Sequence, residues 1–258
     1  MVADIDLLID AAYASGEIAK KYWKKTPDVW EKSGGAGPVT EADLAIDRML
    51  KSELTHARPD YGWLSEETED TSDRLNREHV FIIDPIDGTR AFIEGSPTFS
   101  HSLAIAKNGI ITAAAVYLPA LDRLYCATEH GYATLNGDKI DASTRTSIDG
   151  ATTLAAKTNF SAYLWQGPVP QFDHHFRSSL AYRLCLIANG RFDIMLTLRD
   201  TWEWDVAAGS LIAERAGACV TDQIGQRALF NNPRPMLHGM VAAPPEIHAG
   251  IISRLAPR

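Results

Sequence analysis

The stretch Asp84-Pro85-Ile86-Asp87-Gly88-Thr89 follows a short apolar, β-branched run, Val80-Phe81-Ile82-Ile83, which predicts a β-strand. Pro85 fixes its own backbone dihedral, so the chain is expected to turn sharply and present both aspartates on one side. Gly88 permits a close backbone approach, and a helical turn beginning at Thr89 would leave amides free to bind a phosphate group. The stretch predicts oxygen ligands for Mg²⁺ beside hydrogen-bond donors for a phosphate group. An ordinary surface turn is the competing interpretation.

Two further acidic positions add to this stretch. Glu66 lies at the end of a strand-like segment, and Asp205 lies between Trp204 and a helical pattern. Either acid could have a simpler role, because Glu66 could be a solvated strand end and Asp205 a helix cap. Two like charges about 4 Å apart repel by about 4 kcal/mol at an effective dielectric near 20, so converging carboxylates need cations. Oxygen-only ligands favour Mg²⁺ or Mn²⁺ over zinc, and such ions can polarise phosphate and generate hydroxide.

Composition excludes several other classes of function. The 258 residues carry a net charge of -8 and no dense basic tract, which argues against binding to nucleic-acid polymers. The most apolar stretch, 110–118, is much shorter than the roughly 20 residues of a membrane span, and the acidic N-terminal segment does not resemble an export signal. The 3 cysteines are widely scattered. A soluble, cytoplasmic protein is expected.

Hydrophobic periodicity predicts helices at 4–25 and from near Thr40 in the first half of the chain. Strands are expected within 102–118, joined at Asn108-Gly109, and within 123–140. A polar segment at 141–153 suggests a border between an N-terminal α+β subdomain, 1–145, and a C-terminal α/β subdomain, 146–258. The first would hold the antiparallel sheet and most metal ligands. The second would contain helices within 178–189 and 205–216 and would contribute Asp205.

Four sequence blocks together carry a resemblance to a known family. In order, they are Pro38-Val39-Thr40-Glu41-Ala42-Asp43, Ser65-Glu66-Glu67, Ile83-Asp84-Pro85-Ile86-Asp87-Gly88-Thr89 and Trp204-Asp205-Val206-Ala207-Ala208-Gly209. With these blocks the chain resembles the inositol monophosphatase superfamily over nearly its whole length. The resemblance implies an α+β fold, a layered α-β-α-β-α sandwich of the inositol monophosphatase and fructose-1,6-bisphosphatase type. It also implies a homodimer and inhibition by lithium.

The resemblance further implies roles for individual residues around about two to three Mg²⁺ ions. The expected metal ligands are Glu66, Asp84, the carbonyl of Ile86, Asp87 and Asp205. The expected catalytic group is Thr89 paired with Asp43, aiming a water molecule, together with Glu66. Substrate and phosphate would contact Gly88, Thr89, Asp87, Asp205 and Arg199. The mobile-loop lysine of the family best matches Lys32.

The identity of the phosphate ester stays open at the level of sequence. Leu-Ser-Glu-Glu at 64–67 is more similar to bacterial bisphosphonucleotidases, and Leu198 stands where inositol phosphatases carry a substrate-binding acid. Arg199, Arg90 or Arg183 could bind a second phosphate, although each singly could be an ordinary surface arginine. The expected activity is therefore hydrolysis of an inositol monophosphate or a 3'(2'),5'-bisphosphonucleotide. Histidinol phosphate and sugar phosphates are alternative substrates, and a catalytically silent metal- and phosphate-binding regulator is the alternative of another class.

Overall fold

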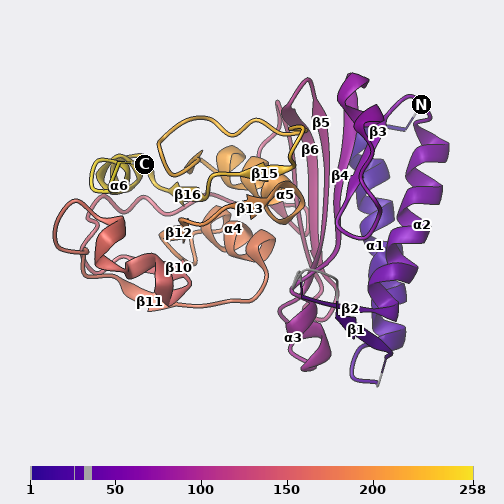
Figure 1. Ribbon diagram of the computed structural model, residues 1–258, viewed down its shortest axis with the longest axis horizontal. Helices are drawn as coiled ribbons and strands as arrows, with labels where there is room; N and C mark the ends of the chain where they lie inside the picture. Colours follow the sequence, from indigo (N-terminus) through magenta and orange to yellow (C-terminus); the bar gives the residue numbers. More distant parts are fainter. Residues whose placement is uncertain (1, 26, 32–36, 258) are drawn as a thin grey trace.

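The computed structural model describes residues 2–25, 27–31 and 37–257, and its helices and sheets form five layers (Figure 1). From right to left in Figure 1 these are a helix pair, a large sheet, a second helix pair, a smaller sheet and a single helix. The chain begins in the first layer and ends beside the last. This arrangement confirms the predicted layered α-β-α-β-α sandwich of the α+β class.

The larger sheet has seven strands in the order β3-β4-β5-β6-β7-β8-β9. Their bounds are β3 Gly62–Ser65, β4 His79–Asp87, β5 Ser100–Lys107, β6 Ile110–Leu118, β7 Arg123–Thr128, β8 Thr134–Leu135 and β9 Asp138–Lys139. Only β3 and β4 pair in parallel, and the other neighbours are antiparallel. Asn108 and Gly109 both have positive φ in the predicted turn between β5 and β6, as the tight primed hairpin requires.

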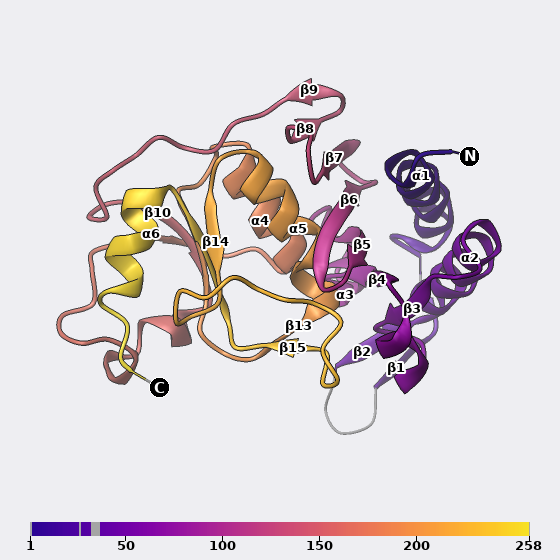
Figure 2. The same ribbon diagram turned by 90° about the horizontal axis from the view of Figure 1, so that it is seen from above.

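The first layer consists of α1, Asp4–Tyr22, and α2, Glu41–Ala57, which cover one face of this sheet (Figure 2). Their apolar positions, including Leu8 and Leu50, pack against Phe81 and Ile105 of the sheet. Helix α1 ends before the predicted limit of residue 25, because the backbone is already extended at Trp23. A short pair, β1 Val29–Glu31 with β2 Pro38–Thr40, was not predicted, since a three-residue strand exposed throughout shows no alternation of apolar residues.

The central layer consists of α4, Leu180–Ala188, and α5, Glu203–Arg215, between the two sheets (Figure 2). Every residue of α4 is buried, as expected for a helix covered on all sides. The two helices approach closely at Gly209, where an added Cβ would lie 2.7 Å from Leu184 Cβ. A glycine at this position therefore lets α5 seat against α4.

The smaller sheet has the order β11-β10-β12-β16-β14 and mixes parallel with antiparallel pairs. Its strands are β10 Thr152–Ala155, β11 Asp173–His175, β12 Ile194–Thr197, β14 Cys219–Thr221 and β16 Met240–Ala243, and α6, Pro245–Ile252, covers its outer face. The shorter elements are η2 Ser72–Asn76, α3 Thr89–Ile93, η3 Lys157–Phe160, η4 Ala162–Leu164, β13 Thr201–Trp202 and β15 Met236–Leu237. The chain leaves one sheet for the other between Lys139 and Thr152, and the subdomain division at 145 stays a prediction.

In the part of the chain that the structure describes, no helix combines the length and the apolar character that a membrane span needs.

Candidate active site

The backbone of β4 is irregular where the Asp-Pro-Ile-Asp stretch pairs with β5. Asp84 pairs with Ser102 and Asp87 with Ser100, so one strand contains an extra residue between the two pairs. Pro85 has no backbone N–H to give to the ladder, which suits it to such a bulge. Gly88 follows with a φ of 95° and ends the strand, and α3 begins at Thr89 as the sequence suggested. The bulge allows both aspartates to face the same side of the sheet.

Asp84, Asp87 and Asp205 converge from two layers of the fold. One carboxylate oxygen from each lies within 4.8 Å of the others, in an arrangement that could hold a metal ion. Asp205 lies inside the first turn of α5, whose N-cap is Trp202, so the helix-cap interpretation of Asp205 is wrong. Asp84 Oδ1 is buried and has no hydrogen-bond partner among the described residues. An orphaned buried carboxylate oxygen beside two further carboxylates fits a cation.

Glu66 joins this acidic cluster from the end of β3. Its backbone N–H donates to the carbonyl of Ile83 at 3.2 Å, which sets the residue beside the end of β4. The charge of Glu66 contributes to raising the pKa of Asp84, which places the two carboxyl groups close together. The structure thus brings together all four acids that the sequence suggested as metal ligands, although their role as ligands stays a prediction.

Burial makes the cluster electrostatically costly in the absence of a cation. Desolvation is the main cause that raises the pKa of Asp84 and of Asp205 well above the usual range, and neighbouring carboxylates raise both further. Desolvation also raises the pKa of Asp87 to about 6, against the opposing effect of hydrogen bonds from Ser179 and Ala181. A divalent cation would reverse these shifts because it favours the charged form of each carboxyl group.

Asp87 is held in place from the central helix layer. Its Oδ2 accepts hydrogen bonds from Ser179 Oγ at 2.6 Å and from the N–H of Ala181 at 2.7 Å. Ser179 is the N-cap of α4 and also bonds Ser100 of β5 at 2.9 Å. We did not predict this residue, although a serine directly before an apolar helical run is an N-cap signal.

Thr89 and Asp43 are in contact beside the cluster. Thr89 Oγ1 lies 3.4 Å from Asp43 Oδ1 and 3.2 Å from the carbonyl of Ile86. Asp43 is fully buried, and its other oxygen accepts a hydrogen bond from the N–H of Thr40 at 2.9 Å in a capping box that starts α2. The same carboxylate therefore begins a helix and fixes the threonine hydroxyl.

A cavity of about 590 Å³ opens over these groups. It is lined by all of the predicted metal and phosphate positions, namely Glu66, Asp84, Ile86, Asp87, Gly88, Thr89, Arg199 and Asp205. Arg90 and Arg183 line it as well, whereas Leu198 is buried in the protein core. Lys32 lies outside the described residues.

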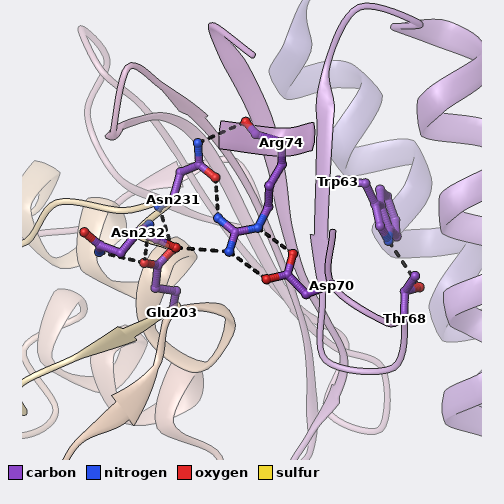
Figure 3. Close-up of polar contacts among 7 residues, drawn as sticks. All are labelled: Trp63, Thr68, Asp70, Arg74, Glu203, Asn231 and Asn232. Atoms are coloured by element: carbon purple, nitrogen blue, oxygen red, sulfur yellow. Dashed lines mark hydrogen bonds and ion pairs between the residues drawn. The ribbon is translucent and has the colours of Figure 1, made fainter. Parts of the chain in front are cut away.

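Helix α5, which carries Asp205, is fixed by a buried polar network (Figure 3). The carboxylate of Glu203 accepts hydrogen bonds from the N–H groups of Asn231 and Asn232 at 2.6 and 2.9 Å. Arg74 of η2 donates to Asn231 Oδ1 at 2.6 Å and forms an ion pair with Asp70. Sequence patterns did not reveal this network, because η2 and the segment after residue 228 are far apart in the chain.

Similarity to solved structures covers nearly the whole of this fold. The chain matches the structure of the IMPase of Thermotoga maritima with a TM-score of 0.82 and 29% identity, covering 96% of this chain and 94% of that one. It matches the extragenic suppressor protein suhB of Bartonella henselae with a TM-score of 0.81 and 26% identity over 98% of both chains.

Sequence comparison places the chain in a family. The sequence model of the inositol monophosphatase family matches residues 3–257. The inositol-1-monophosphatase of Rhizobium meliloti (strain 1021) is 33% identical over 232 residues, 86% of each chain. The fructose-1,6-bisphosphatase/inositol-1-monophosphatase of Thermotoga maritima is 32% identical, over 87% of this chain and 86% of that protein. The chain belongs to the inositol monophosphatase family, and it is a phosphatase of the kind that acts on small phosphorylated substrates.

Proposed function

We propose that the chain is a Mg²⁺-dependent phosphomonoesterase that acts on a small phosphate ester. The observation that carries this proposal is the convergence of Asp84, Asp87 and Asp205 at a cavity, with Asp84 Oδ1 buried and orphaned. The donors are all oxygens, which suits Mg²⁺, with Mn²⁺ as a possible substitute. About two to three ions are expected, held by Glu66, Asp84, the carbonyl of Ile86, Asp87 and Asp205. When bound, the metal would supply Lewis-acid polarisation of the phosphate and a more acidic water.

The chain itself supplies orientation and proton placement. Thr89 Oγ1 donates a hydrogen bond towards Asp43 or the carbonyl of Ile86, so an oxygen lone pair stays available to accept a hydrogen bond from a water molecule. When the water gives its proton to Thr89 Oγ1, the hydroxyl proton of Thr89 can pass to the carboxylate of Asp43. Gly88 and Thr89 stand at the start of α3 and face the cavity, where the backbone can approach a phosphate group. Glu66 completes the proposed catalytic set. No side-chain nucleophile is needed for direct attack by water.

The substrate is proposed within the range that the relatives suggest. The names of the relatives include inositol-1-monophosphatases, a fructose-1,6-bisphosphatase/inositol-1-monophosphatase and a histidinol-phosphatase that is 27% identical over 252 residues. We propose an inositol monophosphate or a 3'(2'),5'-bisphosphonucleotide, with histidinol phosphate or a sugar phosphate as the alternative. A cytoplasmic homodimer that lithium inhibits belongs to the same proposal.

Release of inorganic phosphate tests this function directly. The purified chain is assayed with inositol 1-phosphate, adenosine 3',5'-bisphosphate, histidinol phosphate and fructose 1,6-bisphosphate, in Mg²⁺, Mn²⁺ or EDTA and with added Li⁺. We expect turnover of at least one ester in Mg²⁺ and none in EDTA. If a folded protein binds Mg²⁺ and phosphate yet hydrolyses none of the esters, the alternative of a silent regulator is favoured instead.

A further inference from the structure

We infer that Arg183 and Arg199 form a subsite for a second anionic group, a phosphate or a carboxylate, carried by the alcohol part of the substrate. The inference rests on the proposed function and narrows its substrate class. The two arginines come from different elements, since Arg183 belongs to α4 and Arg199 to the loop between β12 and β13. Both line the cavity that contains the acidic cluster.

Arg183 is fixed in place before any ligand binds. Only 5% of its surface is exposed, its Nε donates to the carbonyl of Arg177 at 2.6 Å, and its guanidinium stacks 4.5 Å from the ring of Phe176. Among the described residues, its two terminal nitrogens form no hydrogen bond and no ion pair. A guanidinium held at one edge and one face keeps its other edge ready to bind an oxyanion, with little side-chain entropy left to lose.

The charge of Arg183 is incompletely balanced within the protein. The pKa of Arg183 is lowered to about 10, mainly by burial and also by the charge of Arg199, whereas Asp87 and Asp205 act in the opposite direction. These two aspartates are also proposed to hold metal ions. Once a cation neutralises them, the buried guanidinium loses its nearest compensating charges, and an anionic group on the ligand would restore the balance.

The loop that carries Arg199 presents a cation, and not a carboxylate, to the cavity. Leu198 is buried, with its N–H bonded to Asn159 Oδ1 at 2.7 Å, and Asp200 is paired with His238 at 3.0 Å. Arg199, between these two anchored residues, lines the cavity. This wall therefore offers no acid to bind the hydroxyl groups of a neutral polyol.

The cavity lining also includes Arg90 of α3 and Glu94 at the C-cap of that helix, which have opposite charges. Phe176 is 52% exposed and lines the cavity beside Arg183, so it offers an apolar surface for the carbon skeleton of a ligand. A phosphate ester with a second anion attached to a compact skeleton fits these surfaces.

Matched pairs of substrates test the subsite. The values of kcat/KM are measured in Mg²⁺ for fructose 1,6-bisphosphate against fructose 1-phosphate, and for adenosine 3',5'-bisphosphate against adenosine 3'-monophosphate. In at least one pair the wild type is expected to prefer the ester with the second anion by about 10- to 100-fold, the usual effect of charge-assisted hydrogen bonds. Arg183→Met and Arg199→Gln should each reduce this ratio, chiefly through KM.

Binding without turnover provides an independent readout. The affinity for fructose 6-phosphate and for adenosine 5'-monophosphate, which keep only the second anion, is measured by calorimetry in Mg²⁺ and inorganic phosphate. Arg183→Met should weaken the tighter of the two by about tenfold or more. Arg191→Met, a change at an exposed arginine outside the cavity, is the matched control, and Arg183→Lys preserves the buried charge if the methionine variant does not fold.

The outcomes separate this inference from the proposed function. The inference is overturned if the wild type does not prefer the doubly anionic ester in either pair, or if Arg183→Met lowers kcat/KM equally for both members of the preferred pair. Equal losses would mean that Arg183 contacts the phosphate that is cleaved. Absence of all phosphate release contradicts the proposed function alone, because the calorimetric comparison still decides whether Arg183 binds an anion.

Discussion

Arg74 of η2 and Glu203 of α5 are joined through Asn231 and Asn232. Arg74 donates to Asn232 O at 3.0 Å, and Glu203 accepts from Asn232 Nδ2 at 2.7 Å (Figure 3). Glu203 is fully buried and begins α5, two residues before Asp205. The network therefore sets the position of one proposed metal ligand from outside the site.

Replacing Glu203 tests this control of position. Glu203→Gln removes the charge and places an amide donor against the N–H groups of Asn231 and Asn232. We expect a loss of about 1–3 kcal/mol in the free energy of unfolding, measured by urea titration, and a higher Mg²⁺ concentration for half-maximal activity. The control is Glu246→Gln, a change at an exposed position of α6. Unchanged stability and unchanged Mg²⁺ activation in Glu203→Gln would show that the network does not position α5.

Asp84→Asn tests the metal centre itself. The amide should abolish turnover, because the buried oxygen that has no other partner would lose its charge. Without metal, the variant should be more stable than the wild type at neutral pH by on the order of 1 kcal/mol, since one mutually repelling carboxylate is gone. Phosphate release and thermal unfolding in EDTA measure the two effects. Wild-type-like activity would refute the proposed ligand set, and Asp138→Asn, at an exposed strand position, is the control.

The raised pKa of Asp87 predicts a specific pH dependence of the metal-free protein. Its folded pKa of about 6 exceeds the ordinary value of 3.8, so the folded state takes up the proton more readily than the unfolded state. The resulting stabilisation is fully present below about pH 4 and is lost as the pH rises through about 6. In EDTA, the unfolding free energy of the wild type relative to Asp87→Asn should therefore fall between pH 5 and pH 7.5. A free-energy difference between the two proteins that rises over this interval would contradict the raised pKa of Asp87. Adding Mg²⁺ should make this difference nearly independent of pH.

Ser179→Ala tests the support of Asp87 from α4. The change removes the 2.6 Å bond to Asp87 and the N-cap bond from Tyr182. We expect a loss of about 1 kcal/mol in stability from the missing cap. Turnover should also fall, with the Mg²⁺ requirement rising. Ser179→Thr keeps a hydroxyl group and should restore much of both properties, whereas equal defects in the two variants would indicate a steric effect at this buried position.

Local signals in the sequence predicted the parts of the fold and site that depend on local chemistry. The Asn108-Gly109 hairpin, the helix that Thr40 caps and the Asp84–Thr89 turn each depend on residues close in the chain. The start of α5 was placed at Asp205 instead of Glu203, because the apolar period is clearest only after the aspartate.

Positions that depend on tertiary packing were not predicted. Arg183 could have been an ordinary surface arginine, yet it is buried because the layers enclose α4 on every side. Arg74 reaches Asn231 only when segments 157 residues apart meet, and Glu203 accepts from the same asparagine 28 residues further along the chain. Neither periodicity nor spacing contains information about such long-range pairs.

The separate origins of Asp84 and Asp205, from a strand and from a helix of the next layer, make the proposed ion a cross-link between layers. Because such an ion would bind only the docked arrangement, raising its concentration should stabilise the folded chain in proportion to the logarithm of its excess over the dissociation constant. The affinity of the chain for the ion would then measure how accurately the strand layer and the helix layer pack together. A distant packing defect would be detected first as weaker metal binding, before any loss of secondary structure.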